Sequence, residues 1–450
     1  MSGISEILHR QGYPISGSDI ADSDTTRKLR SLGIRVDIGH DAKNLGHPKV
    51  VVISTAVKLD NPELREAVHL RIPVIRRAEM LGEIMRGKTG IAVAGTHGKT
   101  TTTSMMASVL VQAELSPTIV IGGKVDALGG ANAVLGDGEI VLAEADESDG
   151  SFIHLPATYA IITNIDADHL DHFANLDAID EAFIGFVRQI PFYGTTVVCG
   201  DDLGVQRCMP KFAKPFLIYG TNASFDYYLK DLQQVPGKTE FDVYQRGGVK
   251  LGRVQLPAQG DHNAMNALAV VALSHAMGVE FSKIVEGLKK FSGVKRRFET
   301  RYERADKSVR VIDDYGHHPT EVSATLAAAR KFWGDKRIVV VFQPHRYSRT
   351  LHCEAGFIEC FKDADTVFLT DIYAASEDPI PGVHSKVLAS KIETSFQAPK
   401  ETFYSGSLPD TLIQVSAYVQ EGDLILTLGA GSITHLAPDI GKALDARWNS

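Results

Sequence analysis

Short apolar runs alternate with helical patterns along most of the chain. Near the start, the runs at 50–53 and 73–75 lie on either side of a helical pattern over 61–70. Apolar runs of this length, separated by helices, are typical of strands buried in a parallel sheet. The pattern therefore predicts a first small α/β domain over residues 1–88.

The same alternation continues in two further blocks, 89–294 and 295–450. In the second block we expect strands at 91–94, 140–143, 159–162 and 195–199 and a helix at 261–277. Residues 216–256 differ, because short alternating segments are broken by turns at 236–237 and 247–248, which predicts a β-rich insert. In the third block the expected strands lie at 309–312, 338–342, 367–369 and 424–428. This block is predicted to be a Rossmann-like α/β domain.

The start of the chain departs from this pattern. A helical pattern over 6–12 comes first, and the next strand is expected near 13–16, ending in Gly17-Ser18-Asp19. A nucleotide-binding α/β domain normally begins with a strand and a glycine-rich turn before its first helix. Neither precedes this helix, so we expect the first strand of the N-terminal domain to be missing.

Composition adds limits to this outline. A chain of 450 residues with 44% hydrophobic and 23% charged residues is expected to form about two to four globular domains. The net charge of −8 gives no general attraction to nucleic acid or anionic membranes, and no apolar run approaches the ~18 residues of a membrane span. The four cysteines form no CxxC pair, so free thiols in the cytoplasm are expected.

The strongest chemical signal follows the run at 91–94. A glycine-containing loop leads from this expected strand into a helix, and such a helix start presents backbone N–H groups to an anion. Lys99 would reach a terminal phosphate and the Thr100 hydroxyl would bind Mg²⁺. An ordinary glycine turn with an exposed lysine is the alternative, and only two residues separate Gly95 from Gly98 where the general pattern has four. The candidate loop residues are Gly95, Thr96, His97, Gly98, Lys99, Thr100 and Thr101.

Two acidic clusters follow the next expected strands. They occupy residues 144–149 and 166–171, and the second contains His169. Carboxylates and imidazole at adjacent strand ends are suited to divalent cations that bridge the phosphates of ATP. Helix capping is the alternative for each cluster alone. Their position beside a phosphate loop favours a metal site.

Polar side chains with possible ligand roles recur later in the chain. Asn263 and Asn266 are three residues apart on one helix face and could meet a single ligand, although capping is the alternative for Asn263. The third block places 313–319 after one strand and 343–349 after the next. Arg346 and Arg349, three residues apart, are suited to gripping a carboxylate or phosphate, with surface charge as the alternative.

These segments, in this order, resemble the Mur ligase superfamily of ATP-dependent amide-forming enzymes. The motifs that carry the resemblance are GTHGKTTT, EADESD, NIDADHLD, DHNAMNALA, RRFE, DDYGHHPTE and QPHRYSRT. The resemblance runs over nearly the whole chain. It implies a Rossmann-like UDP-binding domain over 1–88, a P-loop ATPase-like domain over 89–294, and a Rossmann-like amino-acid-binding domain over 295–450.

The resemblance also implies residue roles. Lys99 and Thr100 would bind the ATP phosphates and Mg²⁺, and Glu144 and His169 would bind metal ions. The nucleotide would be lined by Asn263, Asn266, Arg297 and Asp314. The incoming amino acid would be positioned by Tyr315, His317, Arg346 and Arg349. The UDP moiety would lie near Ser18, Asp19, Ser54 and Thr55. The chemistry would depend most directly on Lys99, His169, Arg297 and His317.

The implied reaction joins L-alanine to the lactyl carboxylate of UDP-N-acetylmuramate, through an acyl phosphate made with ATP and Mg²⁺. It belongs to peptidoglycan precursor synthesis in the cytoplasm, and the enzyme would be a monomer or homodimer. The pair DDYGHHPTE and QPHRY differs from that of most family members, although the related murein-tripeptide ligase comes close. The alternatives are therefore another ligase of this type, or an ATP-binding scaffold without ligase activity.

Overall fold

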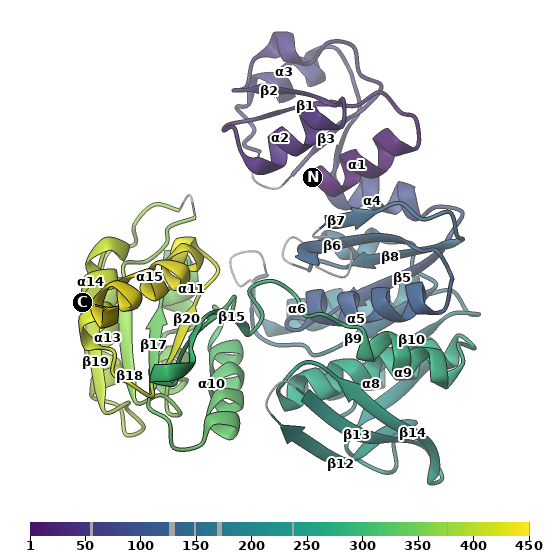
Figure 1. Cartoon of the computed structure of the whole chain (residues 1–450). Helices are drawn as coiled ribbons and strands as arrows, with labels where there is room; N and C mark the ends of the chain where they lie inside the picture. Colours follow the sequence, from purple (N-terminus) through teal and green to yellow (C-terminus); the bar gives the residue numbers. More distant parts are fainter. Residues whose placement is uncertain are drawn as a thin grey trace.

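The structure is a computed structural model that describes residues 1–54, 57–125, 131–147, 150–168, 173–235, 238–375 and 377–449. Its elements form α/β units in three parts of the molecule (Figure 1). The N-terminal elements lie at one end, and the two large sheets lie beside each other below them. The predicted α/β fold class is confirmed. The boundaries at 88/89 and 294/295 stay predictions.

The N-terminal part contains two separate pairs of parallel strands. β1 (Ser16–Asp19) pairs with β2 (Arg35–Ile38), and β3 (Val51–Ile53) pairs with β4 (Val74–Arg76). The strand expected near 13–16 begins only at Ser16, so Gly17-Ser18-Asp19 makes up most of the strand and Asp19 ends it. Pairing with β2 overrides the low strand propensity of Gly, Ser and Asp. The helices of this part are α1 (Ser2–Arg10), α2 (Asp24–Ser31), α3 (Pro62–His69) and α4 (Arg77–Met85).

The N-terminal part has only a small core of its own. Leu29, Ile34 and Val36 form its buried cluster, with Ile15 packed against them. Helices α1 and α4 instead bury Ile4, Ile7, Leu81 and Met85 in the core of the central part. These two helices therefore attach the N-terminal strands to the sheet that carries the phosphate loop.

The central sheet has ten strands in the order β14-β13-β12-β11-β10-β9-β5-β8-β6-β7. Its middle, from β12 to β6, is parallel, and antiparallel strands close both ends. The β-rich segment predicted at 216–256 forms β11 to β14, which extend this sheet. The strands are β5 (Thr89–Ala94), β6 (Thr118–Val125), β7 (Ala131–Val134), β8 (Ile140–Glu144), β9 (Tyr159–Ile162), β10 (Thr195–Cys199), β11 (Phe216–Gly220), β12 (Tyr227–Val235), β13 (Lys238–Gln245) and β14 (Val249–Leu256).

Helices cover both faces of the central sheet. On one face α5 (Lys99–Gln112), α8 (Asp261–Ala276) and α9 (Phe281–Lys289) share an apolar core with the strands. On the other face α6 (Leu176–Gln189) and α7 (Leu203–Cys208) pack together with α1 and α4. Helix α8 is largely buried from Ala264 to Ser274, which explains why this stretch is mainly apolar on all sides.

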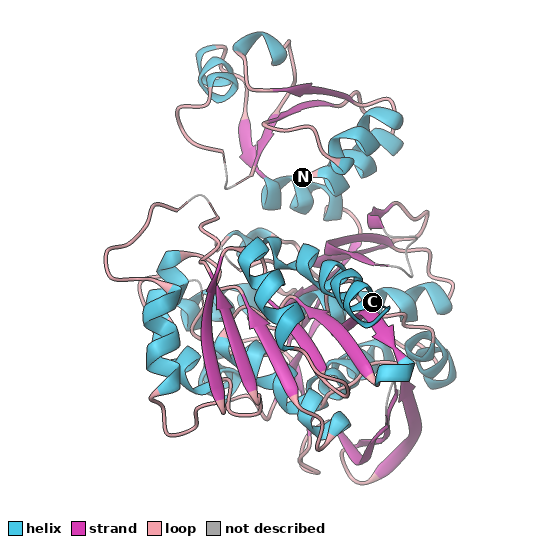
Figure 2. Cartoon of the chain, turned by 60° about the vertical axis from the view of Figure 1, so that its left-hand side comes forward, coloured by secondary structure: helices cyan, strands magenta, loops and turns pink. Residues whose placement is uncertain are grey.

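The C-terminal sheet has six strands in the order β15-β16-β20-β17-β18-β19, and only β15 is antiparallel. Figure 2 shows these strands side by side between helices. The strands are β15 (Glu299–Arg304), β16 (Val309–Asp314), β17 (Ile338–Phe342), β18 (Thr366–Thr370), β19 (Glu401–Gly406) and β20 (Leu424–Leu428). The helices are α10 (Pro319–Trp333), α11 (Tyr347–His352), α12 (Glu354–Glu359), α13 (Ser385–Glu393), α14 (Leu408–Tyr418) and α15 (Leu436–Asn449).

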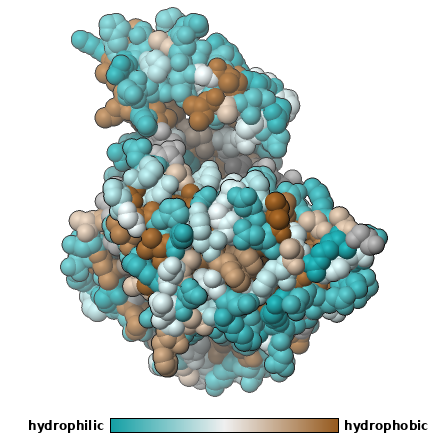
Figure 3. Space-filling model, turned by 90° about the vertical axis from the view of Figure 1, so that its left-hand side faces the viewer, coloured by the Kyte–Doolittle hydropathy of each residue, from teal (hydrophilic) through white to brown (hydrophobic). Residues whose placement is uncertain are grey.

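The surface shows the same division. In Figure 3 the upper lobe is joined to the body through a constriction, and apolar residues are scattered among polar ones on the visible face. Within the described ranges, no helix has the length and apolar character that a membrane span requires.

Candidate functional site

A cleft of about 2890 Å³ runs between the three parts of the molecule. Residues from each part line it, so any ligand that fills it contacts elements far apart in the sequence. The sequence-predicted residues that line it are Ser18, Asp19, Ser54, Thr96, His97, Gly98, Lys99, Thr100, Glu144, Arg297, Tyr315, His317, Arg346 and Arg349.

The phosphate loop has the geometry that the sequence predicts. Helix α5 begins directly after Gly98, whose φ of 83° lies in the left-handed region, and no side chain caps the helix start. A Cβ on Gly95 would lie 2.1 Å from Thr163 Oγ1, and one on Gly98 would lie 3.0 Å from Asn266 Oδ1. Both glycines therefore allow close approach of neighbouring chain. The start of α5, with no side-chain cap, lies at the cleft, and its backbone N–H groups are suited to an anion.

Lys99 is buried beside carboxylates. Its Nζ donates to Glu147 Oε1 at 2.7 Å and to the carbonyl oxygens of Gly95 and Thr96 at 2.7 and 3.0 Å. Burial works to lower the pKa of Lys99, but the negative charge of Glu147 and its neighbours raises it overall. Burial raises the pKa of Glu147 to about 7, against the pull of Lys99. Lys99 is thus a permanent cation within the loop.

Oxygen ligands lie next to Lys99. Thr100 Oγ1 donates to Glu144 Oε1 at 3.0 Å, and the other carboxylate oxygen of Glu144 accepts from the backbone N–H of Gly122 at 2.8 Å. A hydroxyl and a carboxylate at this spacing form the hard donor set that Mg²⁺ prefers. His169, the third predicted metal ligand, lies outside the described residues.

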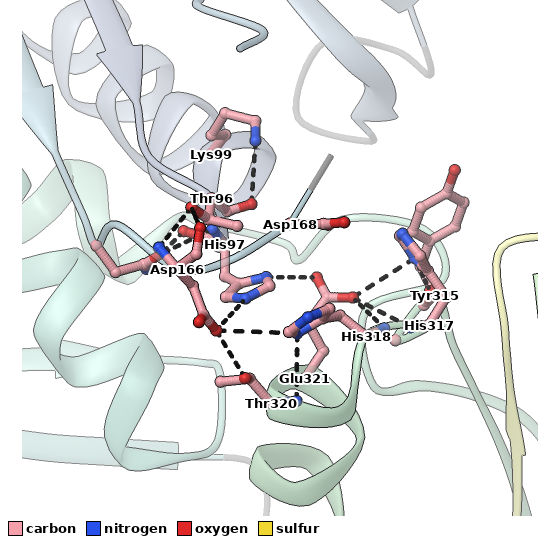
Figure 4. Close-up of polar contacts among 12 residues, drawn as sticks. Thr96, His97, Lys99, Asp166, Asp168, Tyr315, His317, His318, Thr320 and Glu321 are labelled. Carbon is pink, nitrogen blue, oxygen red and sulfur yellow. Dashed lines mark hydrogen bonds and ion pairs between the residues drawn. The ribbon is translucent and has the colours of Figure 1, made fainter. Parts of the chain in front are cut away.

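A network of side chains joins the phosphate loop to the C-terminal part (Figure 4). His97 Nε2 lies 3.2 Å from Asp166 Oδ2, and its Nδ1 lies 3.6 Å from Glu321 Oε1. Thr320, at the start of α10, donates its hydroxyl to Asp166 Oδ2 at 2.8 Å. The first turn of α10 is thereby held against the loop that follows β9.

The charges in this network are complementary. Burial works to lower the pKa of His97, but hydrogen bonds to Asp166 and Glu321 raise it to about 9. The same hydrogen bond holds the pKa of Asp166 well below its usual range. His97 is therefore an imidazolium between two carboxylates at neutral pH. His97, Asp166 and His318 lie close enough to hold a metal ion. In the protonated ring, however, Nε2–H is directed at Asp166 and Nδ1–H at Glu321, so His97 has no lone pair for a metal.

The opposite wall of the cleft carries histidines and arginines. The ring of Tyr315 lies beneath the guanidinium groups of Arg296 and Arg297, at 4.9 and 5.3 Å. His317 Nδ1 lies 3.0 Å from the carbonyl oxygen of Tyr315, and burial lowers the pKa of His317 to about 3. Because a carbonyl can only accept, Nδ1 carries the proton and Nε2 keeps a lone pair.

The two arginines of the third block have different partners. Arg349 forms a bidentate pair with Asp168, with Nε and Nη2 at 3.2 and 3.0 Å from Oδ1. Both side chains are less than a tenth exposed, at 9% and 8%. Arg346 is 39% exposed and lies 3.7 Å from Glu377. They do not form one joint clamp, although both line the cleft.

Comparison with known proteins gives matches over almost the whole chain. Residues 1–89 match the Mur ligase family, catalytic domain; residues 93–274 the Mur ligase middle domain; and residues 296–431 the Mur ligase, glutamate ligase domain. The UDP-N-acetylmuramate–L-alanine ligase of Trichlorobacter lovleyi is 49% identical over 99% of this chain and 96% of its own length. The chain belongs to the Mur ligase family.

Solved structures of other Mur ligases share this fold. The crystal structure of UDP-N-acetylmuramate–alanine ligase from Thermotoga maritima superposes with a TM-score of 0.81 at 30% identity, covering 100% of this chain and 97% of that one. A murein peptide ligase from Psychrobacter arcticus gives a TM-score of 0.73 at 23% identity, covering 99% and 96%. The second likeness shows the fold alone.

In this Mur ligase, other predicted residues lie away from the lining of the cleft. Asn266 packs on Gly98, but the amide of Asn263 donates to the carbonyl of Gln259 at 2.5 Å. Asp314 is buried, and its two oxygens accept from the N–H groups of Phe298 and Gly316, both at 2.8 Å. In the structure, these hydrogen bonds hold the backbone at Phe298 and Gly316, next to Tyr315. Gly95 and Thr101 are also absent from the lining among the described residues.

The predicted UDP-side residues lie at the far end of the cleft. Ser18 donates its hydroxyl to Glu63 Oε2 at 2.9 Å and lies 3.0 Å from His40 Nδ1. Ser54 and Asp19 line the same region, and Thr55 lies outside the described residues. Ser18 of β1 thus has two polar partners, His40 and Glu63, that the sequence did not indicate.

Several residues of the site were not singled out from the sequence. Glu321 forms a capping box with His318 at the start of α10, and that H-x-x-E spacing is visible in the sequence. Asp166 and Asp168 lie within a cluster that was recognised, without individual roles. Asn164 is the first residue of the motif NIDADHLD and was likewise given no role of its own; its Oδ1 accepts from the N–H of His97 at 2.7 Å.

Proposed function

We propose that this chain is an ATP-dependent ligase that joins L-alanine to the lactyl carboxylate of UDP-N-acetylmuramate, a step of peptidoglycan precursor synthesis. The observation that carries the proposal is the single cleft lined by the phosphate loop, the N-terminal strands and the arginine wall. The name of a relative that is 49% identical over 99% of the chain supports the choice of substrates.

The phosphate loop fits ATP. The uncapped start of α5 and the buried cation Lys99 would bind the β- and γ-phosphates, and Thr100 with Glu144 would hold Mg²⁺. Bound there, Mg²⁺ would neutralise charge on the phosphate oxygens. Arg297 faces the same cleft from the C-terminal part and would add a second positive charge.

The proposed chemistry has two steps. The lactyl carboxylate attacks the γ-phosphorus of ATP, the bond to the β–γ bridging oxygen breaks, and an acyl phosphate and ADP result. The amine of alanine then attacks the acyl carbon, phosphate leaves, and the amine loses a proton to give the amide. The protein contributes mainly by placing the three substrates in line and by stabilising negative charge.

His317 is suited to orient the amine. Its neutral ring has Nε2 as an acceptor, so it can receive a hydrogen bond from the amine of alanine. With a pKa of about 3, the imidazole of His317 is too weak a base to accept the released proton at neutral pH. We therefore propose an orienting role for His317 and leave the proton to solvent or phosphate.

The decisive experiment measures ADP release by the purified full chain with ATP, Mg²⁺ and UDP-N-acetylmuramate. Separate reactions contain L-alanine, glycine, L-serine or the murein tripeptide. We expect rapid release with L-alanine and formation of the amide product by mass spectrometry. Release with the tripeptide alone would identify a murein-peptide ligase. ATP binding without product in any reaction would identify a scaffold.

The setting of the enzyme is part of the proposal. All four cysteines are free thiols in the structure, which fits the proposed location in the reducing cytoplasm. A monomer or homodimer is proposed, and sedimentation of the purified protein distinguishes the two.

A further inference from the structure

Arg349 is held by a residue of another part of the molecule. It lies on α11, directly after the third-block strand β17, whereas Asp168 follows β9 of the central sheet. Arg349 Nε lies 3.2 Å from Asp168 Oδ1, and Nη2 lies 3.0 and 3.3 Å from Oδ1 and Oδ2. In Figure 4, Asp168 points away from Asp166 and toward the side where Tyr315 and His317 lie.

The carboxylate of Asp168 occupies one edge of the guanidinium. Asp168 binds the edge of Arg349 that is formed by Nε and Nη2. The end formed by Nη1 and Nη2 is the second edge, and its Nη1 points to a different neighbour. Nη1 lies 3.4 Å from His345 Nδ1, and all of these residues line the cleft. A planar guanidinium has two edges that can each bind a carboxylate. Arg349 can therefore keep Asp168 and still meet a second carboxylate end-on.

Burial decides between two roles for Asp168. As a stand-in for the substrate carboxylate, it would have to leave Arg349 when the substrate binds. The Asp168 side chain is only 8% exposed, so release would separate a buried carboxylate from the guanidinium that it faces, which is disfavoured. A lasting pair avoids this cost and fixes the orientation of the arginine.

We propose that Asp168 is a positioning residue for the amino-acid substrate: it holds Arg349 across the domain interface so that the outer end of the guanidinium receives the substrate carboxylate. This inference rests on the proposed function and assigns Asp168 a role that acts through Arg349. The amino-acid site is then complete only while the central and C-terminal parts are docked.

The test compares Asp168→Asn with the wild-type chain in the ADP-release assay. Asparagine keeps the shape of the side chain but loses its charge and one strong acceptor. We expect the KM for alanine to rise about tenfold or more, with the KM values for ATP and UDP-N-acetylmuramate changed less than about twofold. Asp168→Glu, which keeps a carboxylate, should recover part of the loss.

A double variant tests whether Asp168 acts through Arg349. Arg349→Lys alone removes the planar fork and should itself raise the KM for alanine. Adding Asp168→Asn to Arg349→Lys should then raise this KM by less than about twofold, because the two residues act as one unit. Independent, multiplying effects would overturn the proposal.

Asp423→Asn is a matched control. Asp423 is buried and forms a bidentate pair with Arg337, which is 27% exposed, at 2.9 and 2.7 Å, but within the C-terminal part and away from the cleft lining. We expect it to lower the melting temperature without changing the KM for alanine. An alanine KM that rises equally in both variants would mean that loss of any such pair loosens the enzyme, and the proposal would fail.

Two further results would overturn the proposal. A lower KM for alanine in Asp168→Asn would make Asp168 a stand-in for the substrate. An equal rise in the Mg²⁺ requirement and the alanine KM would mean that Asp168 acts through its neighbour His169. Failure of the proposed function is distinguishable, because the wild-type chain would then release no ADP with alanine.

Discussion

The phosphate loop and the arginine wall of the cleft are held in different ways. Backbone groups of His97 bond to Asn164 and Thr163, which lie in the same central part as the loop. On the other wall, Arg349 takes its bidentate partner from the central part, and Glu321 of α10 faces His97. The backbone of the loop is therefore held within the central part, whereas the guanidinium of Arg349 is held by a residue of another part.

Under the proposed function, this difference would separate nucleotide binding from amino-acid binding. A loop fixed by its own sheet and helix should bind phosphate whatever the C-terminal part does. An arginine fixed by another domain should bind its ligand well only after docking. The comparison therefore predicts that changes at the interface affect alanine more than ATP.

The largest effect is expected for Lys99→Ala. Loss of this buried cation removes charge stabilisation from the transferring phosphoryl group, so kcat should fall by about a thousandfold or more. Folding should survive, because Glu147, whose pKa is already raised to about 7, can take up a proton. Kinetics and circular dichroism check both points, and near-normal turnover would remove the phosphate-loop interpretation.

A smaller effect, confined to alanine, is expected for Arg349→Lys. Lysine cannot form the bidentate pair with Asp168, so the KM for alanine should rise about ten- to a hundredfold while the KM for ATP stays within about twofold. Arg346→Lys should have a weaker effect, since Arg346 is 39% exposed. Arg337→Lys, away from the cleft lining, is the control. Equal changes for ATP and alanine would contradict the division between the walls.

Glu321→Gln should loosen the interface more gently. One of the two carboxylates that face His97 loses its charge, so the pKa of His97 should fall from about 9 by about one unit. NMR titration of the imidazole signals measures this shift. We expect kcat/KM for alanine to fall about three- to tenfold, with ATP binding by calorimetry unchanged. An unchanged His97 pKa would show that Glu321 does not contribute to the network.

The smallest effect is a pH dependence of stability. The pKa of His97 is raised from 6.5 to about 9 in the folded protein, so the protonated ring stabilises the fold fully below about pH 6.5. This contribution is lost as the pH rises through about 9. The melting temperature of the wild type should exceed that of His97→Gln by about 1–3 °C at pH 7, and the difference should shrink by pH 10. A constant difference would exclude the titration.

Most strands of the two large sheets could be predicted from apolar runs. The run at 195–199 is β10 and the run at 338–342 is β17, because strands buried on both faces are continuous apolar segments. The first strand of the chain, β1, was harder to predict from the sequence. Gly17-Ser18-Asp19 lies inside β1 through pairing with β2, a non-local contact that local propensity does not reveal.

In the candidate site, too, some residues could be named from local sequence, whereas the contacts of others depend on the tertiary structure. Strand, glycines, lysine and helix define the phosphate loop locally, so Lys99, Thr100 and Gly98 could be named from the sequence. Asp314 carried a local signal as well, but its carboxylate bonds to the chain around it. The structure adds these partners of Asp314 because burial and hydrogen bonding depend on the packed fold, and its role toward a nucleotide stays a prediction.

The sequence by itself determined the alternation of strands and helices, the phosphate loop and the polar strand ends that carry the Mur ligase motifs. These features are local, since periodicity, glycine positions and strand ends are read over a few residues. Only the tertiary structure decided that Asp168 pairs with Arg349 and that His97 lies between Asp166 and Glu321. The partners of the first pair are 181 residues apart in the sequence, and the packing of the C-terminal part against the central part brings them together.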